Sequence, residues 1–293
     1  MHFCKNAVFL AATISPMIKI LLPAQRLLYA FTCGWLLCVP LAAQANGGPG
    51  VYIEEMTTKE VSAALRAGKT TVIIPIGGTE QSGPHMDIGK HNTRAHILSG
   101  RIAALLGNAL VAPVLAYTPE GKIDPPTQHM GFAGTISVPD DAFKGILLGA
   151  ARSFKKHGFT DIVLLGDHGG YQSLLAAVAK QYNQEAGHAP ARMLHIAAYY
   201  RATQDTYVAA LKAKGLSTQE IGTHAGSADT SLLMALAPSM VHPELFAEAA
   251  AQGWDGGTLG DPRASSAANG QLGVDALIKI SVDSIKKAVA APR

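Results

Sequence analysis

Cysteine is scarce in this chain of 293 residues, and its three cysteines all lie near the N-terminus, at Cys4, Cys33 and Cys38. If that segment is removed, the remainder has neither a disulfide nor a cysteine thiolate. The sequence also lacks a G-x-S-x-G motif, which exposes a serine nucleophile at the end of a strand. Thiol catalysis and this form of serine catalysis are therefore excluded for the remainder.

An excess of one charge is also missing. The chain carries 24 Lys and Arg residues against 21 Asp and Glu residues. Lys5, Lys19 and Arg26 precede residue 46, and no acidic residue does, so the rest of the chain holds 21 residues of each sign. Balanced charge gives no basic face for a nucleic acid, and we expect no nucleic acid partner.

The first 45 residues are typical of a secretory signal peptide. Lys19 and Arg26 precede an apolar stretch at residues 27–41, and a small-x-small sequence ends at Ala45. The apolar stretch of roughly 15 residues is shorter than the 20 or so that span a bilayer, although an uncleaved anchor is the alternative. We expect cleavage near Ala45 and a periplasmic or secreted protein with no stable membrane insertion afterwards.

The region after the leader has the length of one large domain. Residues 46–54 are predicted to be a linker and residues 55–293 a single domain, while the leader itself starts at Met1 or Met17. Predicted strands alternate with predicted helices along the domain. The strands are 70–78, 109–118, 160–170 and 191–200, and the helices are 56–68, 93–107, 140–159 and 171–187.

The strands are short and almost continuously apolar, as "IVLLG" at 162–166 illustrates. Such strands indicate a parallel sheet that is buried on both faces. We therefore expect an α/β fold, with a mostly parallel sheet and helices on both faces. In open sheets of this kind, ligands bind outside the carboxyl ends of the strands.

Residues of the types that bind metals follow two of these predicted strands. Glu80 and His91 lie in the glycine-rich segment 77–92, and Asp167 and His168 follow the strand that begins near residue 160. Carboxylates and imidazoles are ligands for divalent cations, and the glycines allow a tight loop that points them to one place. The alternatives are solvated loop histidines and, for His168, a structural histidine held by Asp167.

A third group lies in "GTHAGSADTSLLMALAP", residues 222–238. His224 and Asp229 precede an apolar helix, where Thr230 and Ser231 are more simply explained as helix caps. His224 is less easily explained by capping. With neither a serine elbow nor a thiol, hydrolysis by a metal-activated water is the chemistry that these residues favour.

Five segments occur in the order of a known family: "IPIGGTEQSGPH", "GFAGTISVP", "GDHGG", "THAGSADTSLLMALAP" and "GDPRASSAANG". Over about residues 55–285 the chain resembles the creatininase (creatinine amidohydrolase) family. The resemblance implies an α/β fold, metal-dependent hydrolysis of a small-molecule amide, and a homo-oligomer that is often a hexamer.

The resemblance also carries over individual residues. Glu80 and His168 match metal ligands of the family, and His85 matches the later histidine of its first motif. His224 matches a histidine near the reacting group, while Asp229 replaces a usual glutamate.

Other positions depart from the family. Ser82 stands where the family has a metal-binding histidine, and His91 stands where it has an aspartate that bridges two metals. Asp167 replaces a more usual glycine, and Gly170 falls where creatininase has a glutamate ligand. A neutral imidazole has one free donor nitrogen and cannot bridge two cations. These departures favour a single metal over the usual pair.

The resulting hypothesis is one divalent cation, zinc or alternatively manganese or iron, held by Glu80, His91 and His168. In this hypothesis Asp167 or Asp229 acts as general base and His224 protonates the leaving nitrogen.

Two residues of the first motif complete the hypothesis, since Gln81 and His85 would orient the ligands. A non-catalytic periplasmic binding or scaffold protein on the same fold is a competing interpretation, supported by Ser82. A metal-dependent lactonase or sugar-modifying enzyme is another. The sequence alone identifies neither the substrate nor the metal.

Overall fold

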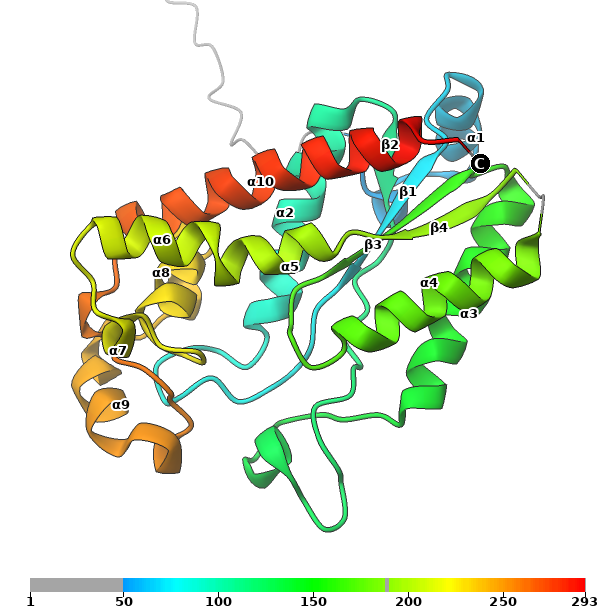
Figure 1. The fold of residues 1–293 in the computed structure, drawn as a ribbon. Coiled ribbons are helices and arrows are strands. Elements are labelled where there is room, and N and C mark those ends of the chain that lie inside the picture. The colour runs from blue at the N-terminus through cyan, green and yellow to red at the C-terminus, as the bar shows by residue number, and fades with distance from the viewer. Residues whose placement is uncertain (1–49, 188–189, 293) are drawn as a thin grey trace, which may run out of the picture. The chain divides into compact units, whose positions relative to one another are not determined.

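The computed structural model describes residues 50–187 and 190–292 (Figure 1). The predicted signal peptide at 1–45, and residues 46–49 of the predicted linker, lie outside the described residues. In the part of the chain that is described, no helix combines the length and the apolar character needed to cross a membrane.

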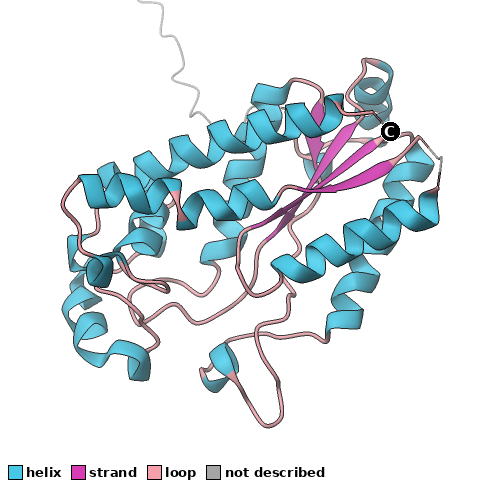
Figure 2. Cartoon of the chain, viewed as in Figure 1, coloured by secondary structure: helices cyan, strands magenta, loops and turns pink. Residues whose placement is uncertain are grey.

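A single sheet of four parallel strands lies at the centre of the domain (Figure 2). Its order is β2-β1-β3-β4, and the strands are β1 (Thr71–Ile76), β2 (Ala109–Val111), β3 (Asp161–Gly166) and β4 (Arg192–His195). The expected α/β fold with a parallel sheet is therefore confirmed.

Helices cover both faces because side chains alternate between the faces along each strand. Ile73 of β1 packs with α2, α5, α8 and α10, whereas Val72 and Ile74 pack with α3 and α4 on the opposite face. The helices are α1 (Thr58–Arg66), α2 (Lys90–Leu106), α3 (Asp140–His157), α4 (Gln172–Ala186), α5 (Ala197–Gln204), α6 (Thr206–Ala213), α7 (Thr218–Ile221), α8 (Ser227–Leu236), α9 (Phe246–Gln252) and α10 (Ala267–Ala290).

All four strands are shorter than their predicted ranges, β2 and β4 most markedly. The strand expected at 109–118 ends at Val111, because Pro113 has no N–H to donate to a ladder. The strand expected at 191–200 ends at His195, and α5 begins at Ala197. This early turn into a helix brings Tyr199 into contact with the end of β3.

The order of the strands places a crevice at the ends of β1 and β3. The chain runs to β2 on one side of β1 and to β3 on the other, which is the topological arrangement that opens a binding crevice. Ile76 pairs with Gly166 at the carboxyl ends of these two strands, and the Asp167 N–H donates to the Ile76 carbonyl at 3.0 Å. The segments that follow the two strands therefore emerge side by side.

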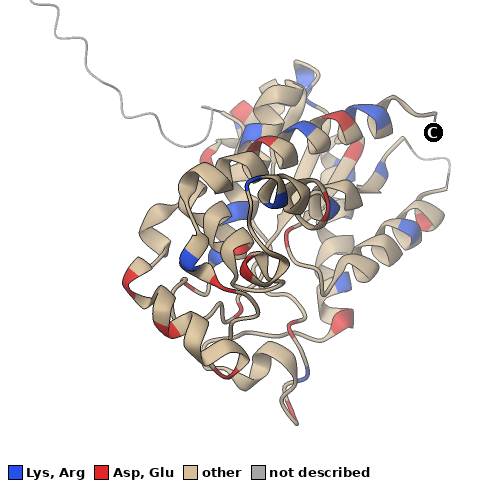
Figure 3. Cartoon of the chain, turned by 60° about the vertical axis from the view of Figure 1, so that its left-hand side comes forward, with Lys and Arg blue, Asp and Glu red and all other residues tan. Residues whose placement is uncertain are grey.

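Residues 118–137, between β2 and α3, form an excursion that leaves the body of the domain and returns to it (Figure 1). Thr118 and Ser137 are bridged at its base, and the Ile136 N–H donates to the Thr79 carbonyl. Most of residues 121–129 are exposed. Charged residues of both signs are interspersed on the surrounding helices (Figure 3).

Candidate metal centre

Glu80 lies in the loop after β1 and is fully buried. Its Oε1 accepts a hydrogen bond from His91 Nε2 at 2.8 Å and lies 3.3 Å from the Lys90 ammonium. Its Oε2 has no hydrogen-bond partner among the described residues. Burial opposes ionisation, but Lys90, His168 and His91 outweigh it and hold the pKa of Glu80 well below its ordinary value. A buried carboxylate oxygen thus stays both charged and unpaired.

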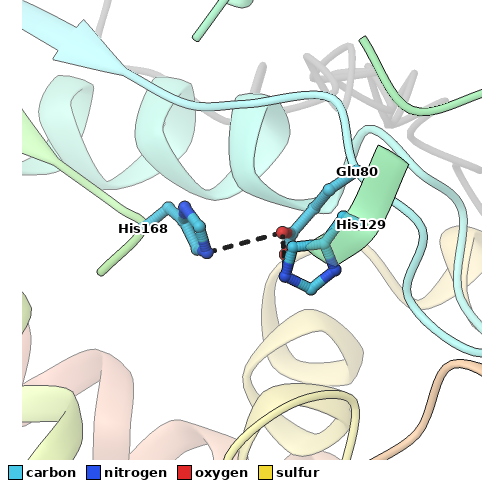
Figure 4. A group of neighbouring side chains, drawn as sticks. All are labelled: Glu80, His129 and His168. Carbon is cyan, nitrogen blue, oxygen red and sulfur yellow. Dashed lines mark ion pairs between the residues drawn. The ribbon is translucent and has the colours of Figure 1, made fainter. Parts of the chain in front are cut away.

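Two imidazoles face this oxygen. His129 Nε2 lies 3.2 Å and His168 Nε2 lies 3.4 Å from Glu80 Oε2 (Figure 4). The three ligand atoms lie within 4.8 Å of one another. Burial lowers the pKa of both histidines, that of His168 to about 4, so their rings are neutral at pH 7 and keep a lone pair. An orphaned carboxylate oxygen and two neutral imidazoles fit a divalent cation.

His91, the third ligand predicted from the sequence, lies in this cluster but has both ring nitrogens engaged. Nδ1 lies 2.6 Å from Asp167 Oδ2, and Nε2 lies 2.8 Å from Glu80 Oε1. Burial and Lys90 lower its pKa, but Glu80 and Asp167 reverse this and raise it overall. A ring nitrogen that donates its hydrogen to a carboxylate offers no lone pair to a metal. Its ligand role stays a prediction, and the geometry favours His129 in its place.

His129 was missed by the sequence reasoning because it lies in the exposed excursion, where no periodicity indicates which side chains turn inward. Its sequence signal was its position just before the motif "GFAGTISVP". The loop is held there by packing, since the rings of His129 and Phe132 both contact the Trp254 ring.

Lys90 and Arg94 are two buried cations that the sequence reasoning also missed. The Lys90 ammonium lies 3.2 Å from Asp229 Oδ2, in addition to its contact with Glu80. Arg94 donates to Asp167 from Nε at 2.9 Å and to Asp229 from Nη1 at 2.7 Å. They lie four positions apart on α2 and therefore share one helix face. That face continues at the buried Leu98. Charges at this spacing on an apolar face were the available signal.

Asp167 and Asp229, the predicted general bases, are held by these cations. Asp167 also accepts a bond from the Tyr199 hydroxyl at 2.7 Å, and Asp229 accepts one from the Ala225 N–H. Burial opposes ionisation of both carboxylates, but Arg94 and its neighbours outweigh it and lower both pKa values. Their catalytic role stays a prediction.

His224 and Gln81 both adjoin the three-residue cluster. His224 Nε2 lies 3.0 Å from the Gln81 carbonyl oxygen, and its Nδ1 lies 3.6 Å from Glu80 Oε1. Burial, followed by Lys90, lowers the pKa of His224 to about 3, so the ring is neutral. Gln81 Nε2 lies 3.1 Å from His129 Nδ1. The predicted role of Gln81 in orienting the ligands stays a prediction.

His85, the other predicted orienting residue, lies farther along the same loop. Its described contacts are with the Thr230 hydroxyl, at 3.0 Å from Nε2, and with the Phe246 ring. These contacts attach the loop to α8 and the start of α9. Its predicted role in orienting the ligands stays a prediction.

Glu120, in the excursion, is a second buried carboxylate beside the cluster and was not among the predicted residues. The Thr118 hydroxyl donates to its Oε1 at 2.6 Å, and its Oε2 lies 3.2 Å from His168 Nδ1. Burial, followed by Glu80, raises the pKa of Glu120 to about 7.

A cavity of about 200 Å³ opens beside the cluster. His129, His168 and His224 line one side of it, and Trp254 and Tyr200 line others. The Trp254 ring lies 5.9 Å from the His129 ring and 6.3 Å from the His224 ring. The three imidazoles thus border a space that admits a small molecule.

The family model described as Creatininase: Creatinine amidohydrolase matches residues 54–285 of the chain. The 3-dehydro-scyllo-inosose hydrolase of Thermotoga maritima is 29% identical over 196 residues, which is 67% of this chain and 59% of that protein. The creatinine amidohydrolase of Pseudomonas putida is 25% identical over 260 residues, which is 81% of this chain and 96% of that protein. The chain therefore spans less than two thirds of the first relative and nearly all of the second.

Solved structures share the fold. The structure described as creatininase Mn has a TM-score of 0.68 and 24% sequence identity, covering 82% of this chain and 99% of that one. A mutant creatininase described as Zn-Zn type has the same score, identity and coverage.

Proposed function

The chain belongs to the creatininase family, and from this premise we propose that it is a metal-dependent hydrolase that cleaves a C–N amide bond of a small molecule. The creatinine amidohydrolase of Pseudomonas putida has the longer of the two matches reported above, and its name supports an amide substrate. The other is named a hydrolase of an inosose, so family membership by itself does not select one substrate.

One observation carries this proposal. The charged Oε2 of Glu80 is buried without a hydrogen-bond partner in the described part of the chain, and two neutral imidazole nitrogens face it. A buried carboxylate oxygen without a hydrogen-bond partner is costly, and a bound cation removes that cost. We therefore assign Glu80, His129 and His168 as the ligands.

We propose one zinc ion for each chain, because one carboxylate and two imidazoles form a recognised catalytic zinc set. Manganese and iron accept the same donors. Lys90 and His91 occupy Glu80 Oε1, so only Oε2 is open to a cation, which argues against a second metal. The cation would supply Lewis acidity, which polarises a carbonyl group and makes water ionise near neutral pH.

His224 is the best placed proton carrier. It lines the cavity, its ring is neutral, and Nδ1 lies close to the ligand Glu80. A neutral imidazole can take a proton from the attacking water and pass it to the leaving nitrogen. Asp167 and Asp229 instead neutralise Arg94 and Lys90 and keep His91 and Glu80 in place.

We also propose that the protein is exported to the periplasm or secreted after cleavage near Ala45, and that it assembles as a homo-oligomer, with a hexamer as the family resemblance implies. Intact-mass measurement of the protein recovered from the periplasm tests the first statement: a mature chain that begins at Asn46 is expected. Light scattering on that material tests the second.

The deciding experiment measures metal content in purified mature protein, prepared without chelator, beside the variants Glu80→Ala and His129→Ala. We expect about one tightly bound metal in the wild type and none in either variant, since each loses one of three ligands. His242→Ala is the matched control, because His242 is exposed and pairs with Asp87 at the surface. It should retain the metal.

Hydrolysis of linear and cyclic amides is then compared between the wild type and His224→Ala. We expect His224→Ala to bind the metal and to lose about 10²–10⁴-fold in kcat, the usual contribution of an acid–base group. A folded wild type without metal, or a metal-loaded protein that hydrolyses no amide in the set, would contradict the proposal and favour the non-catalytic binding function.

A further inference from the structure

Glu120 reaches the metal centre from the excursion rather than from any of the segments that resemble the family. Its backbone N–H donates to the Ser137 hydroxyl oxygen at 3.0 Å, and the Thr118 hydroxyl donates to its Oε1 at 2.6 Å. Both bonds are made at the base of the excursion, where the chain is anchored to the body. They fix the side chain and leave Oε2 without a hydrogen-bond partner among the residues described.

The unpartnered oxygen faces the back of a ligand. Glu120 Oε2 lies 3.2 Å from His168 Nδ1, which is also buried and lacks a hydrogen-bond partner in residues 50–187 and 190–292. The other ring nitrogen, Nε2, lies 3.4 Å from Glu80 Oε2. The ring of His168 therefore lies between two carboxylates, with one at each nitrogen.

This arrangement bears on which nitrogen of the neutral His168 ring carries the hydrogen. A neutral ring has one N–H and one lone pair, and only the lone pair can bind a cation. A carboxylate lies at each nitrogen, but a cation bound at Glu80 Oε2 would exclude a proton from Nε2. The N–H is then carried at Nδ1, where Glu120 can accept it. The lone pair of His168 then points at the proposed cation position.

Two glycines make the contact between Glu120 and His168 possible. A Cβ added to Gly78, which has a φ of +145°, would lie 2.6 Å from Glu120 Oε1. A Cβ added to Gly170 would lie 3.0 Å from His168 Cε1. Side chains at these positions would displace one partner or the other, so the local backbone is shaped around this pair.

We propose that Glu120 is a positioning residue of the metal centre. Its carboxylate accepts the Nδ1 proton of His168 and thereby holds Nε2 unprotonated and aimed at the cation. The inference rests on the proposed function, because it assigns a partner to one of the three proposed ligands. Carboxylates that hold a metal-binding histidine in this way contribute about 10–100-fold to metal affinity.

The test measures Zn²⁺ and Co²⁺ affinity by competition with a chelator, together with the visible spectrum of the Co²⁺-loaded protein. We expect Glu120→Ala to bind both metals about 10–100-fold more weakly than the wild type and to shift the Co²⁺ bands, which report ligand geometry. The metal affinity of Glu120→Gln should fall between those of the wild type and Glu120→Ala, because its amide oxygen can still accept the Nδ1 proton.

Asp124→Ala is the matched control. It removes an exposed carboxylate from the same excursion, and it should retain wild-type affinity and spectrum. Equal losses in Asp124→Ala and Glu120→Ala would attribute the effect to a general disturbance of the excursion and overturn the inference. Unchanged affinity and spectrum in a folded Glu120→Ala would overturn it as well. A wild type that binds no metal would instead refute the proposed function itself.

Discussion

A single buried ammonium group, that of Lys90, contacts two carboxylates in the core of this domain. Its Nζ lies 3.3 Å from Glu80 and 3.2 Å from Asp229. Arg94, one helical turn later, repeats the arrangement with Asp167 and Asp229. Because these charges are shielded from water, each one depends on its partners for compensation.

Lys90→Met should therefore destabilise the protein strongly. Removing one member of a buried charge network leaves its partners uncompensated and costs about 3–5 kcal/mol in the free energy of unfolding. Urea denaturation monitored by circular dichroism measures this cost. Lys279→Met is the matched control, because Lys279 forms an exposed pair with Asp283 and its loss should cost at most about 1 kcal/mol. Equal stability of the two variants would contradict the role of Lys90.

His85 gives the stability a defined pH dependence. Burial, followed by the charge of Lys90, lowers the pKa of His85 to about 4, whereas an unfolded histidine titrates near 6.5. Between these two pKa values, the unfolded chain therefore binds a proton that the folded chain does not bind. The resulting loss of stability begins as the pH falls through 6.5 and is complete below about 4.

His85→Gln should remove this contribution. Its stability should fall less steeply than that of the wild type between pH 6.5 and 4, by about 3 kcal/mol at most over the interval. Denaturation curves at several pH values in this window measure the difference. Parallel profiles for the two proteins would show that His85 is protonated as easily in the folded state as in the unfolded state.

At the scale of elements, helices α8 and α10 approach so closely that a glycine is required between them. Gly270 lies in the first turns of α10, and an added Cβ would collide with the Ser231 carbonyl oxygen of α8. Gly149 also lies inside a helix, α3, but an added Cβ there meets nothing within 4 Å.

Replacing these two glycines by alanine should have opposite effects. Gly270→Ala should destabilise the protein by more than about 1 kcal/mol, because overpacking costs about 1–3 kcal/mol. Gly149→Ala should stabilise it by about 0.5–1 kcal/mol, since alanine loses less backbone entropy in a helix. Thermal or urea denaturation of both variants tests the pair. Stabilisation by Gly270→Ala would mean that the helices lie farther apart than described.

The elements that the sequence reveals are those with a local signal. Apolar runs predicted all four strands, and so Glu80 and His168 were correctly expected at one sheet edge. The α10 helix was not predicted, although Ser266 caps it, and neither His129 nor Glu120 lies in a periodic segment that indicates which side chains turn inward. Their positions depend on how the excursion packs against Trp254 and Ser137, which are distant in sequence.

At the scale of the whole molecule, the proposed ligand His129 would couple metal binding to the order of the excursion. His129 contacts Glu80 and Gln81, and Phe132 contacts Trp254, while residues 121–128 lie outside these contacts. A cation between Glu80 and His129 would strengthen the attachment of the tip to the body. Anything that binds only the ordered form stabilises that form.

Removal of the metal should therefore expose the tip to proteolysis. We expect a chelator to accelerate trypsin cleavage after Lys122, which is exposed in the excursion, and His129→Ala to cleave rapidly with or without chelator. Cleavage after Lys214, an exposed residue at the end of α6, is the internal control and should be unchanged. A chelator that left the rate at Lys122 unaltered would contradict the link.

The location of His129 on an exposed segment has a consequence for the protein under the proposal that it is exported. An exported enzyme meets proteases in a medium whose zinc content it does not control. With its tip anchored by the cation, the loaded protein would survive, while the empty protein would be degraded first. Selective degradation of the empty protein would thus keep the remaining population in the metal-loaded form, without any dedicated regulator.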